Sequence, residues 1–164
     1  MATFNHITAA RYALQWARGT NPDYGRFDND CTNFVSQALF AGGWTMVGGS
    51  FFDSTSDSVW WFGKSPLSRS SYTWGGAQNL ANFLSKSGRA TQVDSPTSLG
   101  IGDVVQIAAA GLIHHSMVVT NKSSSDLLLS YHTSDHLDES LAAIKSRLAS
   151  NESFVYWFIR PSYA

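Results

Sequence analysis

Cys31 is the only cysteine of the chain, and it stands where a polar, turn-rich segment gives way to a helical pattern. The apolar residues that follow recur at spacings that put them on one helical face: Phe34, Val35, Ala38 and Leu39. We therefore expect Cys31 at the start of a helix, where the helix dipole and unpaired backbone N–H groups favour the thiolate. This environment suits a nucleophile, although a lone cysteine is also commonly a small buried apolar residue.

A cysteine nucleophile needs a base, and the C-terminal half of the chain supplies histidines. His114 and His115 begin a segment of alternating polarity, so their side chains point to opposite faces of a strand. His115 shares its face with two apolar residues, Met117 and Val119. It is therefore the histidine that we expect to face the interior and the helix that carries Cys31, as in papain-like nucleophile pairs.

A second strand, predicted over 127–132, ends in His132. It follows the polar turn 121–125, which predicts an antiparallel hairpin. Across a hairpin the end of one strand lies opposite the start of the other, so we expect His132 beside the second ring nitrogen of His115, where it fixes the tautomer. Together with Cys31 these residues form a candidate catalytic set. For each histidine taken alone, a surface or structural position is the alternative.

The same histidines have an alternative use as metal ligands, together with nearby carboxylates. The residues concerned are His114, His115, His132 and His136, with either Asp135 or Asp138. Adjacent strand histidines point apart, and the sequence has neither an H-x-x-x-H spacing nor a cysteine cluster. We therefore expect no metal and no other cofactor.

The order of elements predicts an α+β fold of one catalytic domain, residues 1–164. Helices are expected over 2–18, from Cys31 to Gly42, over 77–86 and over 137–150. Strands are expected over 103–107, 113–120, 127–132 and 154–159. This order indicates N-terminal helices packed on a mainly antiparallel sheet.

Segment 44–76 combines aromatic residues with Gly, Ser, Thr and Asp and has no clear periodicity. Long irregular segments inside a compact domain are more often functional than decorative. Trp44 and Trp74 each stand beside glycine and polar residues, so they are predicted to wall a substrate groove. Most of the other tryptophans are expected in the core.

Composition restricts the class of partner. Charged residues make up 14% of the chain and the formal net charge is −1, so no basic face for nucleic acid or for an anionic membrane is expected. No apolar segment approaches a membrane span, and the N-terminus lacks the charged segment and apolar run of a signal peptide. A single cysteine excludes an intramolecular disulfide. We expect a monomer that is stabilised by packing.

Several short blocks stand out along the chain. They are Y-A-x-x-W at Tyr12–Trp16, N-P-x-Y at Asn21–Tyr24, D-C-T-N-F-V-S-Q at Asp30–Gln37, G-G-W at Gly42–Trp44, G-D-V-V-Q at Gly102–Gln106, H-S-M-V-V-T at His115–Thr120 and Y-H-T-x-D at Tyr131–Asp135. Together these blocks resemble the putative amidase domain family, over nearly the whole chain. That family is similar to the CHAP and NlpC-type cell-wall hydrolases, so the resemblance implies a papain-like cysteine hydrolase fold.

The resemblance also implies roles for individual residues. Cys31 corresponds to the nucleophile and His115 to the general base. His132 corresponds to the third, orienting residue, with Asp135 as the alternative for that role. The backbone N–H of Cys31 is a candidate donor to an oxyanion hole. Asp30 precedes the cysteine as in the family's D-C motif.

Substrate and biological setting follow from the same resemblance. Asp30, Trp44 and Trp74 are the candidate substrate-binding residues. The expected reaction is hydrolysis of an amide bond in bacterial peptidoglycan, either as an N-acetylmuramoyl-L-alanine amidase or as a stem or cross-bridge endopeptidase. A phage endolysin that is released through a holin fits the lack of a leader. The competing classes are a zinc amidase and a non-catalytic wall-binding module.

Overall fold

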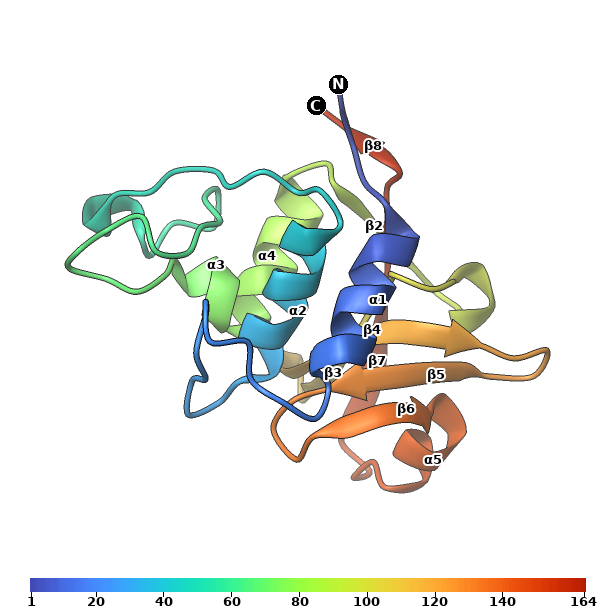
Figure 1. The fold of residues 1–164 in the computed structure, drawn as a ribbon. Coiled ribbons are helices and arrows are strands. Elements are labelled where there is room, and N and C mark those ends of the chain that lie inside the picture. Colours follow the sequence, from blue (N-terminus) through green and yellow to red (C-terminus); the bar gives the residue numbers. More distant parts are fainter.

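Helices from the N-terminal half form one layer of the molecule. The computed structural model describes residues 1–164, and Figure 1 shows these helices beside one face of a sheet. They are α1 (His6–Trp16), α2 (Cys31–Ala41), α3 (Tyr72–Gly75) and α4 (Ala77–Lys86), with the 3-10 turn η1 (Phe51–Asp53) between α2 and α3. None of the helices in the structure combines the length and apolar character that crossing a membrane requires.

The second layer is a six-stranded sheet in which all neighbouring strands pair antiparallel. Its order is β2 (Ala90–Val93), β7 (Glu152–Ile159), β3 (Val104–Ala109), β4 (Leu112–Lys122), β5 (Leu127–Tyr131) and β6 (His136–Ser140). The 3-10 turn η2 (Pro96–Ser98) precedes β3, and α5 (Leu141–Ser146) follows β6. A two-stranded ribbon of β1 (Ala2–Thr3) and β8 (Ser162–Tyr163) brings the chain ends side by side (Figure 1).

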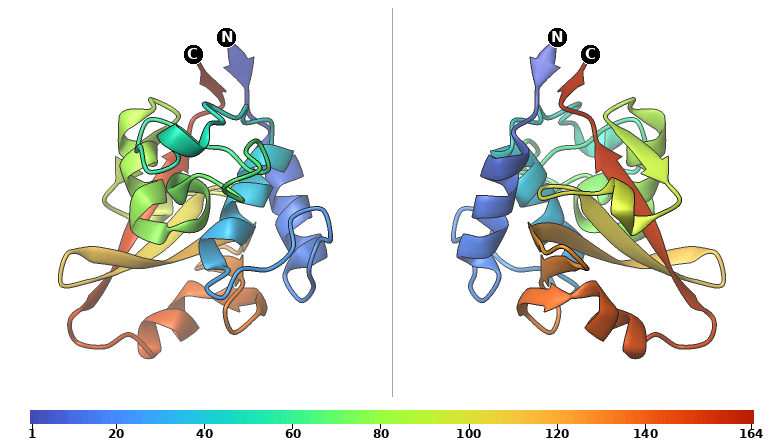
Figure 2. Two further views of the ribbon diagram at one scale, coloured as in Figure 1. Left: turned by 90° about the vertical axis from the view of Figure 1, so that its left-hand side faces the viewer. Right: turned by 90° about the vertical axis from the view of Figure 1, so that its right-hand side faces the viewer.

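Apolar side chains cover both faces of the sheet. The core under the helices contains Phe34 and Leu39 of α2 with Val104 of β3 and Val118 of β4. A second core on the opposite face contains Met117 of β4 and is completed by α5. Alternate residues of β4 therefore belong to different cores, as the period of two predicts. Figure 2 shows α5 at the end of the molecule opposite the two chain ends.

Helix α2 is the most deeply buried element of the helical layer. Every residue from Cys31 to Leu39 is buried, because α2 packs against α1, α3, α4 and strand β4. Its sequence allows this burial, since its residues are apolar, small or uncharged. The start of α2 is thereby held against the sheet.

The predicted α+β arrangement is confirmed. The helix predicted over 77–86 coincides with α4. The strands predicted over 113–120 and 127–132 form the expected antiparallel hairpin, β4 and β5. The first helix is shorter than expected, because residues 2–3 pair with the C-terminal strand β8 instead.

The helix predicted over 137–150 is wrong. Residues 136–140 form β6, which pairs with β5, and only 141–146 is helical. The Ser140 side chain accepts a hydrogen bond from the backbone N–H of Ala143, so the helix begins after the strand. Pairing along the sheet edge outweighs the local helical pattern here.

Candidate functional site

Cys31 is the first residue of α2, as the sequence predicts. Asp30 is the N-cap residue, and its carbonyl oxygen accepts a helical hydrogen bond from the Phe34 N–H at 3.0 Å. The Asp30 side chain does not cap the helix, because it is engaged elsewhere. The backbone N–H of Cys31 belongs to the donors that have no acceptor within the helix, which is the kind of group that forms an oxyanion hole.

The Cys31 thiol is buried against strand β4. The residue is 1% exposed, and its Sγ lies 3.5 Å from Asn29 Oδ1 and 3.7 Å from Thr32 Oγ1. Thr32 Oγ1 in turn hydrogen-bonds to Ser116 Oγ of β4 at 2.9 Å. Burial raises the pKa of the thiol, and hydrogen bonds from Thr32 and from the Ser116 backbone offset only part of that rise. The resting form of Cys31 is therefore the thiol and not the expected thiolate, because the loss of solvation on burial raises the pKa more than the field at the helix start lowers it.

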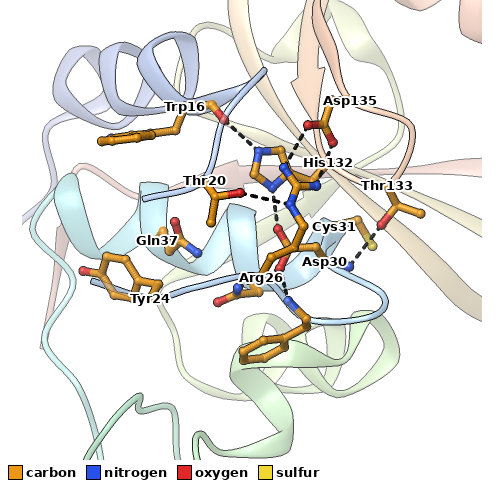
Figure 3. A network of polar contacts seen from close by, with 12 residues as sticks. Trp16, Thr20, Tyr24, Arg26, Asp30, Cys31, Gln37, His132, Thr133 and Asp135 are labelled. Atoms are coloured by element: carbon orange, nitrogen blue, oxygen red, sulfur yellow. Dashed lines mark hydrogen bonds and ion pairs between the residues drawn. The ribbon is translucent and has the colours of Figure 1, made fainter. Parts of the chain in front are cut away.

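His132 and Asp30 form a buried ion pair beside the start of α2 (Figure 3). Nδ1 of His132 binds a carboxylate oxygen of Asp30, and Nε2 binds the carbonyl oxygen of Trp16 at 2.7 Å. Each ring nitrogen of His132 therefore has an oxygen partner inside the protein, and neither is left for another contact. The Asp30 carboxylate also accepts hydrogen bonds from Asn33 Nδ2 at 2.8 Å and from the Phe27 N–H at 2.7 Å.

Asp30 is a structural residue and not part of a substrate surface. Burial alone raises the pKa of Asp30, but the hydrogen bonds that its carboxylate accepts outweigh burial, and the net pKa lies below its ordinary value. The residue is 2% exposed. The assignment of Asp30 to substrate binding is therefore wrong, because the carboxylate is fully engaged inside the protein.

The predicted contact between His132 and His115 is not formed. Both ring nitrogens of His132 are taken by Asp30 and Trp16, and its ring stacks on Phe34 with centroids 4.2 Å apart. The orienting role predicted for His132 is therefore wrong. His132 instead fixes the segment that leads into Cys31.

His115 lines a cleft of about 390 Å³, the His115 cleft, together with residues that include Asn29 and Tyr131. Its ring stands perpendicular to that of Tyr131, with centroids 4.9 Å apart. The neighbouring His114 binds Glu152 at 2.8 Å, whereas no protein group hydrogen-bonds to either ring nitrogen of His115. Burial lowers the pKa of His115 to about 4, with smaller contributions from nearby histidines. His115 is thus a neutral imidazole at pH 7.

Cys31 and His115 approach the same end of β4 from different sides. The thiol lies against the backbone of Ser116, whereas His115 lies with Met117 and Ile107 on the side of the second core. The prediction that His115 faces the helix that carries Cys31 is therefore wrong, because the face it shares with Met117 packs on the second core and not under α2. No hydrogen bond joins the thiol to the imidazole. Asn29 connects the two surroundings, because it lines the His115 cleft and its Oδ1 contacts Cys31 Sγ.

Residues 3–158 match the putative amidase domain family. The chain belongs to this family. YhbB of Bacillus subtilis (strain 168) is 33% identical over 131 residues, which cover 77% of this chain and 40% of that protein. YjcM of the same strain is 28% identical over 148 residues, which cover 82% of this chain and 32% of that protein. Both are described as uncharacterized proteins, and the chain spans 40% or less of their lengths. No solved structure matches.

The remaining histidines and carboxylates of this amidase-family domain do not gather at one point. Asp135, the alternative third residue, forms a bidentate pair with Arg26 at 3.0 and 2.8 Å. His114 and His136 each pair with a separate glutamate. No three His, Cys, Asp or Glu side chains come together in an arrangement that suits a metal ion. The zinc alternative therefore lacks a ligand set in this structure.

Trp44 and Trp74 do not wall a groove, so this prediction is wrong. Trp44 is 1% exposed and Trp74 is 0% exposed. Trp74 donates its indole N–H to Asn33 Oδ1 at 2.8 Å, and its ring lies 4.7 Å from that of Trp60. The irregular segment that carries them folds inward and supports α2, since burying large aromatic area stabilises a small domain.

Asn29 and Thr133 belong to the site, although the sequence reasoning did not single them out. Thr133 Oγ1 accepts a hydrogen bond from the Asp30 N–H at 3.0 Å and donates to Asn29 Oδ1 at 3.3 Å. Thr133 has a positive φ of 62°, which turns the chain after β5 toward α2. Thr133 lies within the Y-H-T-x-D block and Asn29 directly precedes the D-C block, so the motifs indicate these positions. The motifs do not indicate that the two side chains form a hydrogen bond.

Proposed function

We propose that this domain is a cysteine hydrolase with a papain-like fold that cleaves an amide bond of bacterial peptidoglycan. The observation that carries the proposal is that Cys31, at a helix start, lies against Ser116 of β4, next in sequence to His115, a strand histidine whose ring nitrogens make no hydrogen bond. Membership of an amidase family supports amide hydrolysis. The motif resemblance to cell-wall hydrolases favours peptidoglycan, with N-acetylmuramoyl-L-alanine amidase activity as the first choice.

The proposed reaction has two halves. His115 takes the thiol proton as Cys31 Sγ attacks the amide carbonyl, and the backbone N–H of Cys31 stabilises the oxyanion. His115 then donates that proton to the leaving amine, which leaves a thioester. Water, deprotonated by His115, attacks the thioester and releases the carboxylate product and the free thiol.

The first step requires a local rearrangement. The thiol at present donates to Asn29 Oδ1, so this contact opens when imidazole and thiol meet. Catalytic hydrogen bonds are often unformed before substrate binds and tighten in the complex. Because the thiol pKa is raised and the pKa of His115 is about 4, the resting pair is neutral. His115 therefore acts as a general base and not as half of a preformed ion pair.

The test is digestion of purified peptidoglycan, with mass spectrometry of the new termini. Cys31→Ala is expected to give no products, and His115→Ala to lose about 10²- to 10⁴-fold in rate, the usual contribution of a general base. New N-terminal alanine indicates the amidase, and other new amino groups indicate the endopeptidase.

Two controls separate the competing classes. Alkylation of the single cysteine should abolish hydrolysis, whereas a metal chelator should not. Undiminished hydrolysis by Cys31→Ala overturns the cysteine mechanism. Binding of wild-type protein to cell walls without any product overturns the assignment as an enzyme and supports a wall-binding module.

A further inference from the structure

A second and larger cleft, of about 580 Å³, borders the loop that precedes Cys31. Its walls are residues 26–28 of that loop and residues 68–72 from the opposite segment, with Asn79 of α4 nearby. The lining is mostly polar, with an aromatic side chain on each wall, Phe27 and Tyr72. Such a lining suits a polar ligand with a few apolar contacts. We call it the Arg69 cleft.

Arg69 is exposed yet held in place. Its Nη2 donates to the carbonyl oxygen of Tyr24 at 2.7 Å, and its guanidinium carbon lies 4.8 Å from the centre of the Phe27 ring. Gly25 provides the space, since a Cβ there would lie 2.2 Å from Nη2, and its φ of +68° favours glycine. A long surface side chain normally samples many rotamers, so two contacts on one guanidinium preorganise it.

The charge of Arg69 is not neutralised within the protein. The other arginine of the cleft, Arg26, is paired bidentately with Asp135. Arg69 makes no ion pair, and its Nε and Nη1 have no acceptor in the protein. A fixed guanidinium with a free donor edge matches the geometry of a carboxylate. Asp28 is the only carboxylate that lines the cleft, and it too makes no ion pair.

The Arg69 cleft and the His115 cleft meet at consecutive residues. Asp28 lines the first and Asn29 lines the second, and Asn29 contacts the Cys31 thiol. A chain that lies across Asp28 and Asn29 therefore reaches both clefts.

We propose that the Arg69 cleft is a substrate subsite in which Arg69 binds a free carboxylate on the peptide part of the substrate, away from the bond that is cleaved. This inference rests on the proposed function, since it places the ligand relative to Cys31. Arg69 acts in binding and does not touch the reacting atoms. Removal of its charge should therefore raise KM and leave kcat unchanged.

The first test is binding, which does not depend on turnover. The probe is a soluble disaccharide-peptide fragment with acetylated amino groups, titrated by calorimetry into Cys31→Ala. Adding Arg69→Gln should weaken binding about tenfold, as expected for one charged hydrogen-bonded pair. Arg11→Gln, at an exposed arginine outside both clefts, should leave affinity unchanged. Adding Asp28→Asn should tighten binding, because it removes a repulsive charge, and a misfolded variant cannot produce that result.

The second test changes the ligand. Amidation of the probe's carboxylates should weaken its binding to Cys31→Ala about tenfold and have no further effect when Arg69 is already Gln. The subsite is overturned if Arg69→Gln and Arg11→Gln lose the same affinity for the probe. It is also overturned if amidation weakens binding equally to Cys31→Ala and to Cys31→Ala with Arg69→Gln. Arg69-dependent binding without any hydrolysis by the wild type leaves the subsite in place and refutes the proposed reaction instead.

Discussion

His132 and His115 lie at neighbouring strand ends, yet their surroundings differ in kind. His132 is buried, and its two ring nitrogens are held by the Asp30 carboxylate and the Trp16 carbonyl oxygen. His115 is partly buried and makes no hydrogen bond to the protein, and burial lowers its pKa more than Glu152 raises it, so the ring is neutral at pH 7 and its nitrogens stay free. The partners around each ring therefore decide which histidine is structural and which is available for chemistry.

The difference also explains how Cys31 is held. Through His132 the Asp30 carboxylate is connected to the end of α1, because the same ring binds the Trp16 carbonyl oxygen. The Asp30 N–H is connected to the turn after β5 through Thr133. Asp30, the residue before Cys31, is thus held by contacts from the helical layer and from the sheet. His115, which lines the His115 cleft, has no such hydrogen bonds.

The largest effect on stability is expected for His132→Ala. This change leaves the Asp30 carboxylate buried without its His132 partner, and removing one partner of a buried pair typically costs about 3–5 kcal/mol. The free energy of unfolding, measured by urea denaturation, should fall by that amount. Activity should fall as well, since the segment before Cys31 loses its attachment to α1.

His114→Ala is the matched control, because it removes a histidine from a partly exposed pair with Glu152. Such surface pairs contribute about 0–1 kcal/mol, so its free energy of unfolding should change little. If the two variants lose the same stability, or if His132→Ala loses none, the structural role assigned to His132 is refuted.

Local patterns predicted much of this fold. The helix over 77–86 and the β4–β5 hairpin follow from periodicity and turn residues, which depend on neighbours in sequence. Cys31 at a helix start follows from the same kind of signal. Strand β6 does not, because its hydrogen bonds are made to β5 and compete with a local helical pattern.

The candidate site was predictable only in part. Asp30 and His132 are 102 residues apart, and no local pattern shows that their side chains meet. Hairpin geometry correctly brings the two strand ends together but does not say which neighbour each imidazole binds. For Trp44 the composition of the segment indicated exposure, whereas its burial depends on packing against Trp60, Phe83 of α4 and the aromatic residues near the chain ends.

The protonation of His115 provides a sharper comparison with an ordinary imidazole. Its pKa of about 4 means that the ring stays neutral as pH falls through the usual value near 6.5. The acid limb of kcat/KM should therefore lie near pH 4, about two and a half units lower than for an unperturbed imidazole. Ring-proton NMR shifts, assigned with His115→Gln, should show the same midpoint.

The lowered pKa of His115 also makes the free energy of unfolding depend on pH. Between about pH 6.5 and pH 4 the unfolded chain binds a proton at His115 that the folded chain does not. The stability that the neutral ring contributes is therefore lost as pH falls through this window, and His115→Gln should flatten that part of the profile. A midpoint near 6.5 in the NMR titration contradicts the neutral resting state.

The smallest expected effect concerns Asn29, which lies between the buried Cys31 thiol and the His115 cleft. Its Oδ1 accepts the thiol proton and so stabilises the thiol over the thiolate. Asn29→Ala should speed alkylation of Cys31 by iodoacetamide about 2- to 12-fold, which corresponds to one hydrogen bond of about 0.5–1.5 kcal/mol. Asn29→Asp keeps an acceptor and adds a negative charge, so it should slow the reaction. Because Cys31 is the only thiol, the rate reports on this site alone. Equal rates for wild type and Asn29→Ala would show that burial by strand β4, and not the hydrogen bond to Asn29, controls the reactivity of the Cys31 thiol.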